Sequence, residues 1–193
     1  SSIYGNSGDK EMVEDVDEKI NPPSIYASTK LSGETLAKTI LSEYDTNLII
    51  TRFFTVYGEY GRPDMAYFSF LTSILNDKPI TLFNDGCLAR DMTYIDDILA
   101  GIESSISLIS KEKMVKIFNL GNSLPIKTIN LVRKLEKLAN RKAKINYEHI
   151  VDETIQTHAC LLESQKFLDY NPKVKFDEGL EAFYNWYIKY YVK

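Results

Sequence analysis

Glycine is scarce in this chain, which has nine glycines among 193 residues. They nowhere form a Gly-x-x-Gly-x-x-Gly cluster, the arrangement that lets a backbone approach a pyrophosphate at the start of a helix. The sequence therefore lacks the glycine-rich fingerprint of dinucleotide-binding α/β proteins.

Cysteine and basic charge are also sparse. Cys87 and Cys160 form no Cys-x-x-Cys motif and have no histidine pair nearby, which argues against a zinc site or a disulfide framework and predicts reduced thiols. The formal net charge of −4 leaves no basic excess for non-specific binding to nucleic acid or anionic membranes. No apolar run approaches the roughly 20 residues of a membrane span, and the N-terminus does not resemble a signal peptide. We therefore expect a soluble cytoplasmic protein without a metal site.

The patterns that are present alternate between helix and strand, which is typical of an α/β fold. Pro22, Pro23 and Ser24 introduce a predicted helix over 25–44, and a β-branched, aromatic run predicts a strand over 47–54. Further strands are predicted at 80–83, 92–94, 115–119 and 145–147, and further helices after Asp64, over 95–107, over 126–138 and around 180–187.

Acidic residues mark three places in this pattern. The acidic stretch over 5–21 is predicted to be a solvated loop. Asp64 is expected to cap the helix that follows it. Asp96 and Asp97 are expected to cap the next helix rather than to bind a metal.

Tyr26 and Lys30 stand four residues apart, so in a helix they share one face. A free tyrosine is a poor base at neutral pH, but an ammonium held beside a phenol favours its phenolate form. The pair therefore makes Tyr26 a candidate general acid/base. Because the chain contains 13 tyrosines, an exposed helical pair without function is the alternative.

Five further segments surround this pair in a fixed order: SSIYG at 1–5, RFFTVYG at 52–58, GRPDM at 61–65, RDMTYIDD at 90–97 and NLGN at 119–122. Together they resemble the extended short-chain dehydrogenase/reductase family, and within it the NAD-dependent nucleotide-sugar epimerases and dehydratases. The second and third segments are most similar to UDP-glucuronate 4-epimerases of the capsule-biosynthesis type.

This resemblance implies the C-terminal portion of a Rossmann-type fold with a smaller α/β substrate-binding region. Residues 1–54 would be a remnant of the NAD-binding domain. Residues 55–193 would mainly bind the nucleotide sugar, with some segments returning to the Rossmann sheet. Family members begin with a strand, the glycine-rich cluster and a helix, so about the first third of a usual member has no counterpart here.

The family implies a role for each matching position near the cofactor. Tyr26 would take the proton of the sugar 4-hydroxyl while a hydride passes to NAD, which gives a transient 4-keto sugar. Lys30 would bind the nicotinamide ribose, and the backbone of Phe53 would touch the nicotinamide amide.

Substrate contacts are implied for four other residues. Arg90 would grip the diphosphate of a UDP-sugar, and Thr55 with Arg62 would hold the sugar carboxylate. Ser2 lies near the site by register, although it is not the catalytic serine or threonine of relatives. The alternatives are that Arg62 is only a surface residue of a loop and that Arg90 only forms an ion pair with an acidic neighbour. We expect Tyr26, Lys30, Thr55 and Arg90 to line one cleft.

Three functions follow for the whole chain. The first is a UDP-glucuronate 4-epimerase or its C-terminal fragment. The second is a dehydratase of the same superfamily, although the acidic pair that dehydration needs is missing. The third is a non-catalytic remnant. A separate N-terminal polypeptide is a possible partner, and the dimer that relatives form through the tyrosine-bearing helix is expected to be weakened. The segment at 149–154 also departs from the family pattern.

Overall fold

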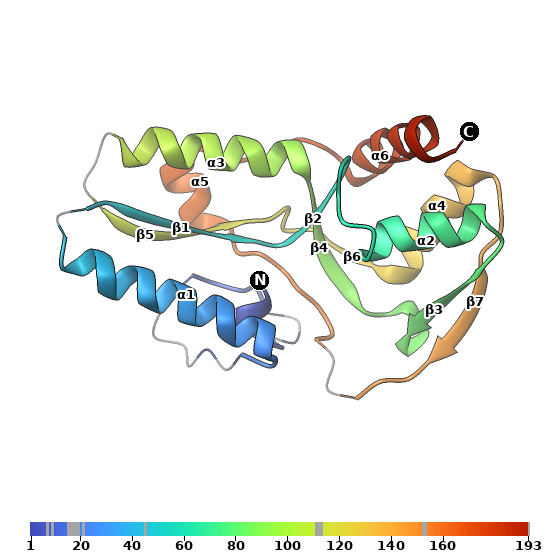
Figure 1. Ribbon diagram of the computed structural model, residues 1–193, viewed down its shortest axis with the longest axis horizontal. Helices are drawn as coiled ribbons and strands as arrows, with labels where there is room; N and C mark the ends of the chain where they lie inside the picture. Colours follow the sequence, from blue (N-terminus) through green and yellow to red (C-terminus); the bar gives the residue numbers. More distant parts are fainter. Residues whose placement is uncertain are drawn as a thin grey trace.

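A continuous strand path over residues 48–57 runs from one half of the molecule into the other (Figure 1). The computed structural model describes residues 1–6, 8, 10–14, 20, 22–44, 46–110, 114–151 and 154–192. Parts of the acidic stretch over 5–21 and of the departure at 149–154 lie outside these residues.

The strand path changes sheets at Phe54. Before it, β1 (Leu48–Phe53) pairs in parallel with β5 (Val115–Leu120). After it, β2 (Thr55–Tyr57) pairs in parallel with β4 (Ala89–Tyr94), which pairs antiparallel with β6 (Pro125–Lys127). The Phe54 backbone N–H donates to the Leu120 carbonyl at 3.0 Å, so the chain leaves β5 only at this residue. Everything near Phe54 therefore lies at the junction of two sheets.

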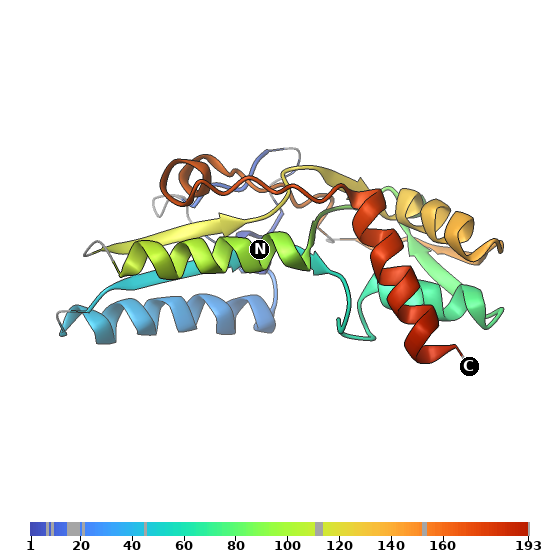
Figure 2. The same ribbon diagram turned by 90° about the horizontal axis from the view of Figure 1, so that it is seen from above.

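Helices cover each half. In Figure 1, α3 (Ile95–Ile109) lies above the β1–β5 pair and α1 (Ile25–Ser42) lies below it, with α5 (Leu162–Leu168) beside β5. Figure 2 shows the remaining helices gathered at the other end of the molecule. They are α2 (Ala66–Leu75), α4 (Thr128–Ala139) and α6 (Phe176–Tyr191), next to the parallel pair of β3 (Pro79–Phe83) and β7 (Lys144–Glu148). Two short 3₁₀ helices, η1 (Ser2–Tyr4) and η2 (Asn84–Gly86), complete the elements.

The two halves have separate cores. Aromatic rings from α2 and α6 fill one core, where Phe183 packs edge-on against Tyr67 with ring centroids 4.8 Å apart. The other core lies around β5, where Phe118 and Leu120 are fully buried. The sequence stripe around 180–187 is thus core packing.

α1 is different because apolar packing barely holds it. Of its 18 residues, all of which the structure describes, only Ala27 is buried. Leu36 and Ile40 are exposed. Polar contacts orient the helix instead: Glu34 accepts two hydrogen bonds from the Arg52 guanidinium, at 2.9 and 2.7 Å.

Arg52 extends this contact into a buried network. Its third N–H group donates to the Tyr4 hydroxyl at 2.8 Å, and Tyr4 donates to the Asn119 side chain at 2.7 Å. Burial raises the pKa of Tyr4 to about 12, so the phenol remains a neutral donor. Asn119 in turn donates to the carbonyls of Met12 and Cys160. One chain of hydrogen bonds therefore links α1, η1, β1 and β5.

The predicted α/β class is confirmed, while both predicted helix caps are wrong. Met65 stands at the start of α2, and Asp64 instead pairs with Arg62. Tyr94 stands at the start of α3, while Asp97 accepts the backbone N–H groups of residues 173 and 174. In each case the carboxylate binds a group outside the helix instead of the N–H groups at the start of that helix.

Element boundaries also differ from the sequence-based expectations. The strand expected over 47–54 corresponds to β1, whereas β2, which follows it after Phe54, was not predicted. Arg90 lies within β4. The NLGN segment at 119–122 begins inside β5, and α5 was not predicted. The division at residue 54 stays a prediction.

Replacing Glu34 with alanine should destabilise the fold strongly. The change leaves the Arg52 guanidinium buried without its carboxylate, since the two side chains are only 4% and 12% exposed. Removing one partner of such a pair costs about 3–5 kcal/mol. Urea unfolding measures this loss, and Glu178→Ala in an exposed pair with Lys175 is the control, with an expected change below about 0.5 kcal/mol. Equal effects of the two substitutions would contradict the role of the Arg52 network.

Candidate active site

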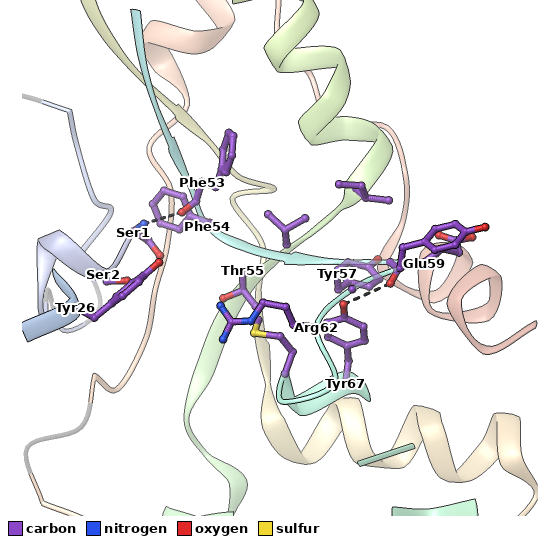
Figure 3. A pocket seen from close by; sticks show the side chains of 16 residues that line it. Ser1, Ser2, Tyr26, Phe53, Phe54, Thr55, Tyr57, Glu59, Arg62 and Tyr67 are labelled. Carbon is purple, nitrogen blue, oxygen red and sulfur yellow. Dashed lines mark hydrogen bonds between the residues drawn. The ribbon is translucent and has the colours of Figure 1, made fainter. Parts of the chain in front are cut away.

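A cavity of about 680 Å³ opens at the junction of the two sheets. Figure 3 shows Ser1, Ser2 and Tyr26 on one side and Thr55, Arg62 and Tyr67 across from them. The floor comes from the strand path, because the carboxyl end of β1 and the whole of β2 line it. The lining is Ser1, Ser2, Tyr26, Phe53, Phe54, Thr55, Val56, Tyr57, Gly58, Glu59, Tyr60, Gly61, Arg62, Met65, Tyr67 and Ile95.

Tyr26 and Lys30 lie at the start of α1. The Ser24 hydroxyl accepts the Ala27 backbone N–H at 3.1 Å and so caps the helix one residue before Ile25. The Lys30 ammonium lies 5.3 Å from the centroid of the Tyr26 ring, as their four-residue spacing requires. Tyr26 is 57% exposed but lines the cavity. The helix start thus presents a phenol beside an ammonium.

Lys30 itself faces an adjoining recess of about 340 Å³. Tyr26, Phe53 and Ser2 line both this recess and the main cavity. Phe53 is partly exposed, and its carbonyl accepts a hydrogen bond from the Ser1 amine at 2.6 Å. The recess combines polar donors from α1 with an aromatic ring at the carboxyl end of β1.

Arg90 faces a different recess, of about 390 Å³, on the other side of Thr55. Its guanidinium donates to the carbonyls of Ala89 and Thr154, both at 2.9 Å. Thr55 lines this recess and the main cavity. The structure therefore brings Thr55 together with both Tyr26 and Arg90, whereas Tyr26 and Arg90 line adjoining spaces rather than one.

The loop after β2 forms the far wall and contains residues that sequence analysis missed. Gly58 has φ of 144°, and a Cβ there would lie 2.6 Å from Ile95 Cγ2, so only glycine fits. Glu59 accepts a hydrogen bond from the Tyr94 hydroxyl at 2.7 Å. Burial, followed by this contact with Glu59, raises the pKa of Tyr94. A carboxylate next to a glycine in a loop gave no recognisable signal in the sequence.

Arg62 lies on the same loop and is paired. Its Nε donates to Asp64 Oδ1 at 3.0 Å, and its Nη2 donates to Asp64 Oδ2. The Arg62 guanidinium lowers the pKa of Asp64 through this hydrogen bonding. The Arg62 side chain is nevertheless 71% exposed and lines the cavity.

Asp91 fixes the loops behind the Arg90 recess. It is fully buried and accepts the backbone N–H groups of Asn122, Ser123 and Ala159 at 2.7–2.9 Å. Burial raises the pKa of Asp91, and these three donors act in the opposite direction. Its own N–H donates to the Thr157 hydroxyl at 3.0 Å. Asp91 is thus occupied by backbone donors, which positions the two loops around the carboxylate.

Within the residues that the structure describes, no three histidine, cysteine, aspartate or glutamate side chains are grouped so that they could hold a metal ion. No helix in the described part of the chain is long and apolar enough to cross a membrane.

Parallel strands that end at a cavity, with the helix of Tyr26 and Lys30 beside it, match the ligand-site position of Rossmann-type α/β folds. Residues 1–121 match the model of the NAD dependent epimerase/dehydratase family. The chain belongs to this family, which confirms the resemblance seen in the sequence.

Individual relatives cover the whole chain. An uncharacterised protein of Methanocaldococcus jannaschii is 44% identical over 98% of this chain and 57% of its own length. UDP-glucuronate 4-epimerase 3 of Arabidopsis thaliana is 40% identical over 99% of this chain and 48% of its own length. The crystal structure of UDP-glucuronic acid 4-epimerase from Bacillus cereus, in complex with UDP-glucuronic acid and NAD, superposes with a TM-score of 0.90 at 34% identity. The superposition covers 99% of this chain and 60% of that one. The chain thus spans about half the length of the curated relatives that it matches.

Replacing Asp91 with asparagine should unfold the loops behind the Arg90 recess. An amide accepts with only one oxygen and turns an NH₂ group toward buried N–H donors, which leaves donors unsatisfied. We expect a loss of about 3 kcal/mol or more in the free energy of unfolding. Thermal unfolding followed by circular dichroism measures it. Asp85→Asn, in the exposed turn at η2, is the control, and a similar loss there would contradict this account.

Proposed function

We propose that this chain is the C-terminal part of an NAD-dependent nucleotide-sugar 4-epimerase that acts on UDP-glucuronate. The observation that carries the proposal is the Tyr26–Lys30 pair beside a cavity that also contains Thr55 and Arg62. The family and the relatives named above support the same choice. The two relatives named above that carry an activity in their names are 4-epimerases, which favours epimerisation over dehydration.

In this proposal Tyr26 moves the proton. It takes the proton from the 4-hydroxyl of the sugar and later returns it to the same oxygen. The Lys30 ammonium lies 5.3 Å from the centroid of the Tyr26 ring, so a cation stands beside the group that moves the proton. Between the two proton transfers the sugar is a 4-keto compound and rotates in the site. The hydride then returns to the other face of C4, which inverts the configuration of that carbon.

The residues near Tyr26 fit one end of NAD. The Lys30 recess offers donors suited to ribose hydroxyls, and Phe53 offers a partly exposed ring at the edge of the sheet. When bound, NAD accepts the hydride of C4 and gives it back. The glycine-rich cradle for the pyrophosphate has no counterpart in this sequence, so these residues would hold only the nicotinamide end.

Charged residues on either side of Thr55 would hold the substrate. Arg90 faces the recess suited to a diphosphate, to which a planar guanidinium donates two parallel hydrogen bonds. Arg62 and Thr55 line the main cavity, where a cation and a hydroxyl suit a carboxylate. This arrangement favours glucuronate over neutral glucose. Ser2 lines all three spaces and is proposed as a minor polar contact.

The isolated chain should be inactive. Among the described residues β1 pairs on one edge only, with β5, and α1 has one buried residue, Ala27. One side of the nicotinamide recess is therefore open to water. Hydride transfer needs the reacting carbons held about 3–3.5 Å apart, which these residues cannot do alone.

Activity should appear when the missing side is supplied. The 193-residue chain with NAD⁺ and UDP-glucuronate is expected to form no UDP-galacturonate by NMR. Joining the N-terminal part of a UDP-glucuronate 4-epimerase to Ser1 should restore turnover. Epimerisation by the isolated chain would refute its dependence on that part, and an inactive but folded fusion would contradict the proposed activity.

Tyr26→Phe tests the proton transfer in the fused protein. Removing the hydroxyl should lower kcat by about 10²–10⁴-fold, since general acid/base catalysis is lost. Tyr44→Phe, an exposed tyrosine just beyond the far end of α1, is the matched control and should leave kcat unchanged. If both variants keep full activity, Tyr26 is not the acid/base.

A further inference from the structure

Asp64 is the residue of the GRPDM segment whose role the fold leaves unexplained. It does not begin α2, and it does not line the cavity. Its carboxylate instead receives two N–H groups of Arg62, two residues earlier. The backbone supports this pairing, because the Met65 N–H donates to the Arg62 carbonyl at 3.2 Å and closes a turn around Pro63. The turn holds the two side chains at one fixed separation.

The pair uses one edge of the Arg62 guanidinium. Asp64 takes Nε and Nη2, which form the side of the planar group. A guanidinium has five N–H donors, so the Nη1–Nη2 end keeps a parallel pair of donors that this contact does not use. A second carboxylate can therefore approach the end of Arg62 while Asp64 stays on its side.

Without Asp64, Arg62 would have little to orient it. The side chain is 71% exposed, and a free arginine has many rotamers of similar energy. Figure 3 shows the Arg62 side chain reaching from the loop toward Thr55 and the Tyr26 side of the cavity. The paired edge keeps the guanidinium plane in this direction before any ligand arrives.

We infer that Asp64 is a positioning residue, which aims the free end of Arg62 at the carboxylate of an acidic nucleotide sugar. The inference rests on the proposed function, since Arg62 is the carboxylate receptor there. It adds a determinant of the preference for acidic over neutral sugars.

Asp64 also offsets part of the Arg62 charge, and this opposes anion binding. Solvent weakens the electrostatic repulsion between the two carboxylates but does not weaken the orienting effect of Asp64. The Asp64 carboxylate and the ligand carboxylate lie on different edges of the guanidinium, and the exposed pair is screened by water and salt. The orientation of the donors is not screened. Positioning therefore outweighs repulsion.

The experiment titrates the 193-residue chain with UDP-glucuronate and with UDP-glucose at millimolar concentrations, with binding measured by NMR chemical shifts. The variants are Asp64→Asn, Arg62→Ala and the two combined. Asp77→Asn is the matched control, because Asp77 forms an exposed ion pair with Lys144 at the other end of α2. Relaxation of the Arg62 Nε–Hε signal reports how well the side chain is ordered.

The unaltered chain should prefer UDP-glucuronate. Asp64→Asn should weaken UDP-glucuronate by about threefold, the size expected for an exposed ion pair, and should loosen the Arg62 signal. Binding of UDP-glucose should not change, Asp77→Asn should alter neither ligand, and Asp64→Asn should add nothing once Arg62 is alanine.

Other results would overturn the inference in distinguishable ways. Tighter UDP-glucuronate binding by Asp64→Asn would make Asp64 a competitor, and an equal loss for both ligands would make its role merely structural. No change for either ligand would leave Asp64 without a role. If the unaltered chain has no preference, or if Arg62→Ala keeps it, then the proposed carboxylate receptor fails and the inference fails with it.

Discussion

The ion pair between Glu34 and Arg52 is the contact on which the candidate site depends. A helix that buries one side chain cannot be placed by the hydrophobic effect, which is proportional to the apolar area removed from water. Two parallel hydrogen bonds between a guanidinium and a carboxylate fix both distance and orientation. They bind the middle of α1 to β1, so Tyr26, two turns earlier, is carried to the cavity at the end of the same strand. The continuation through Tyr4 and Asn119 ties that strand to its neighbour β5.

The change of sheet at Phe54 gives the cavity its position. Ligands in open parallel sheets bind outside the carboxyl ends of strands. Phe53 ends β1, Leu120 ends β5, and Thr55 begins β2 two residues after Phe53. A strand that stayed in one sheet would continue past this point and fill the space. Because the path turns, the same short segment supplies Phe53 to the recess beside Lys30 and Thr55 to the recess beside Arg90.

Carboxylates do most of the positioning in this molecule. Asp91 accepts backbone N–H groups from two loops and Glu59 accepts a phenol O–H, whereas Asp64 and Glu34 each pair with a guanidinium. The Glu34 pair holds α1 against β1. Buried carboxylates are costly to desolvate unless they are fully hydrogen-bonded, which explains why Asp91 has three backbone donors. The exposed Asp64 has no such requirement, and a single guanidinium is its partner.

The sequence alone determined the α/β class, the helix that carries Tyr26 and Lys30, and the membership in the epimerase/dehydratase family. These depend on local periodicity, on a four-residue spacing within one helix and on ordered motifs, all of which are written along the chain. The tertiary structure decided which carboxylate holds which group. Asp64 and Asp97 each precede or begin a helix and were expected to cap it, yet a guanidinium and two distant backbone N–H groups hold them instead. It also decided that Tyr26 and Arg90 line neighbouring spaces that meet at Thr55. Such choices depend on which partners folding brings within hydrogen-bond distance, and that distance is set by long-range packing rather than by neighbours in sequence.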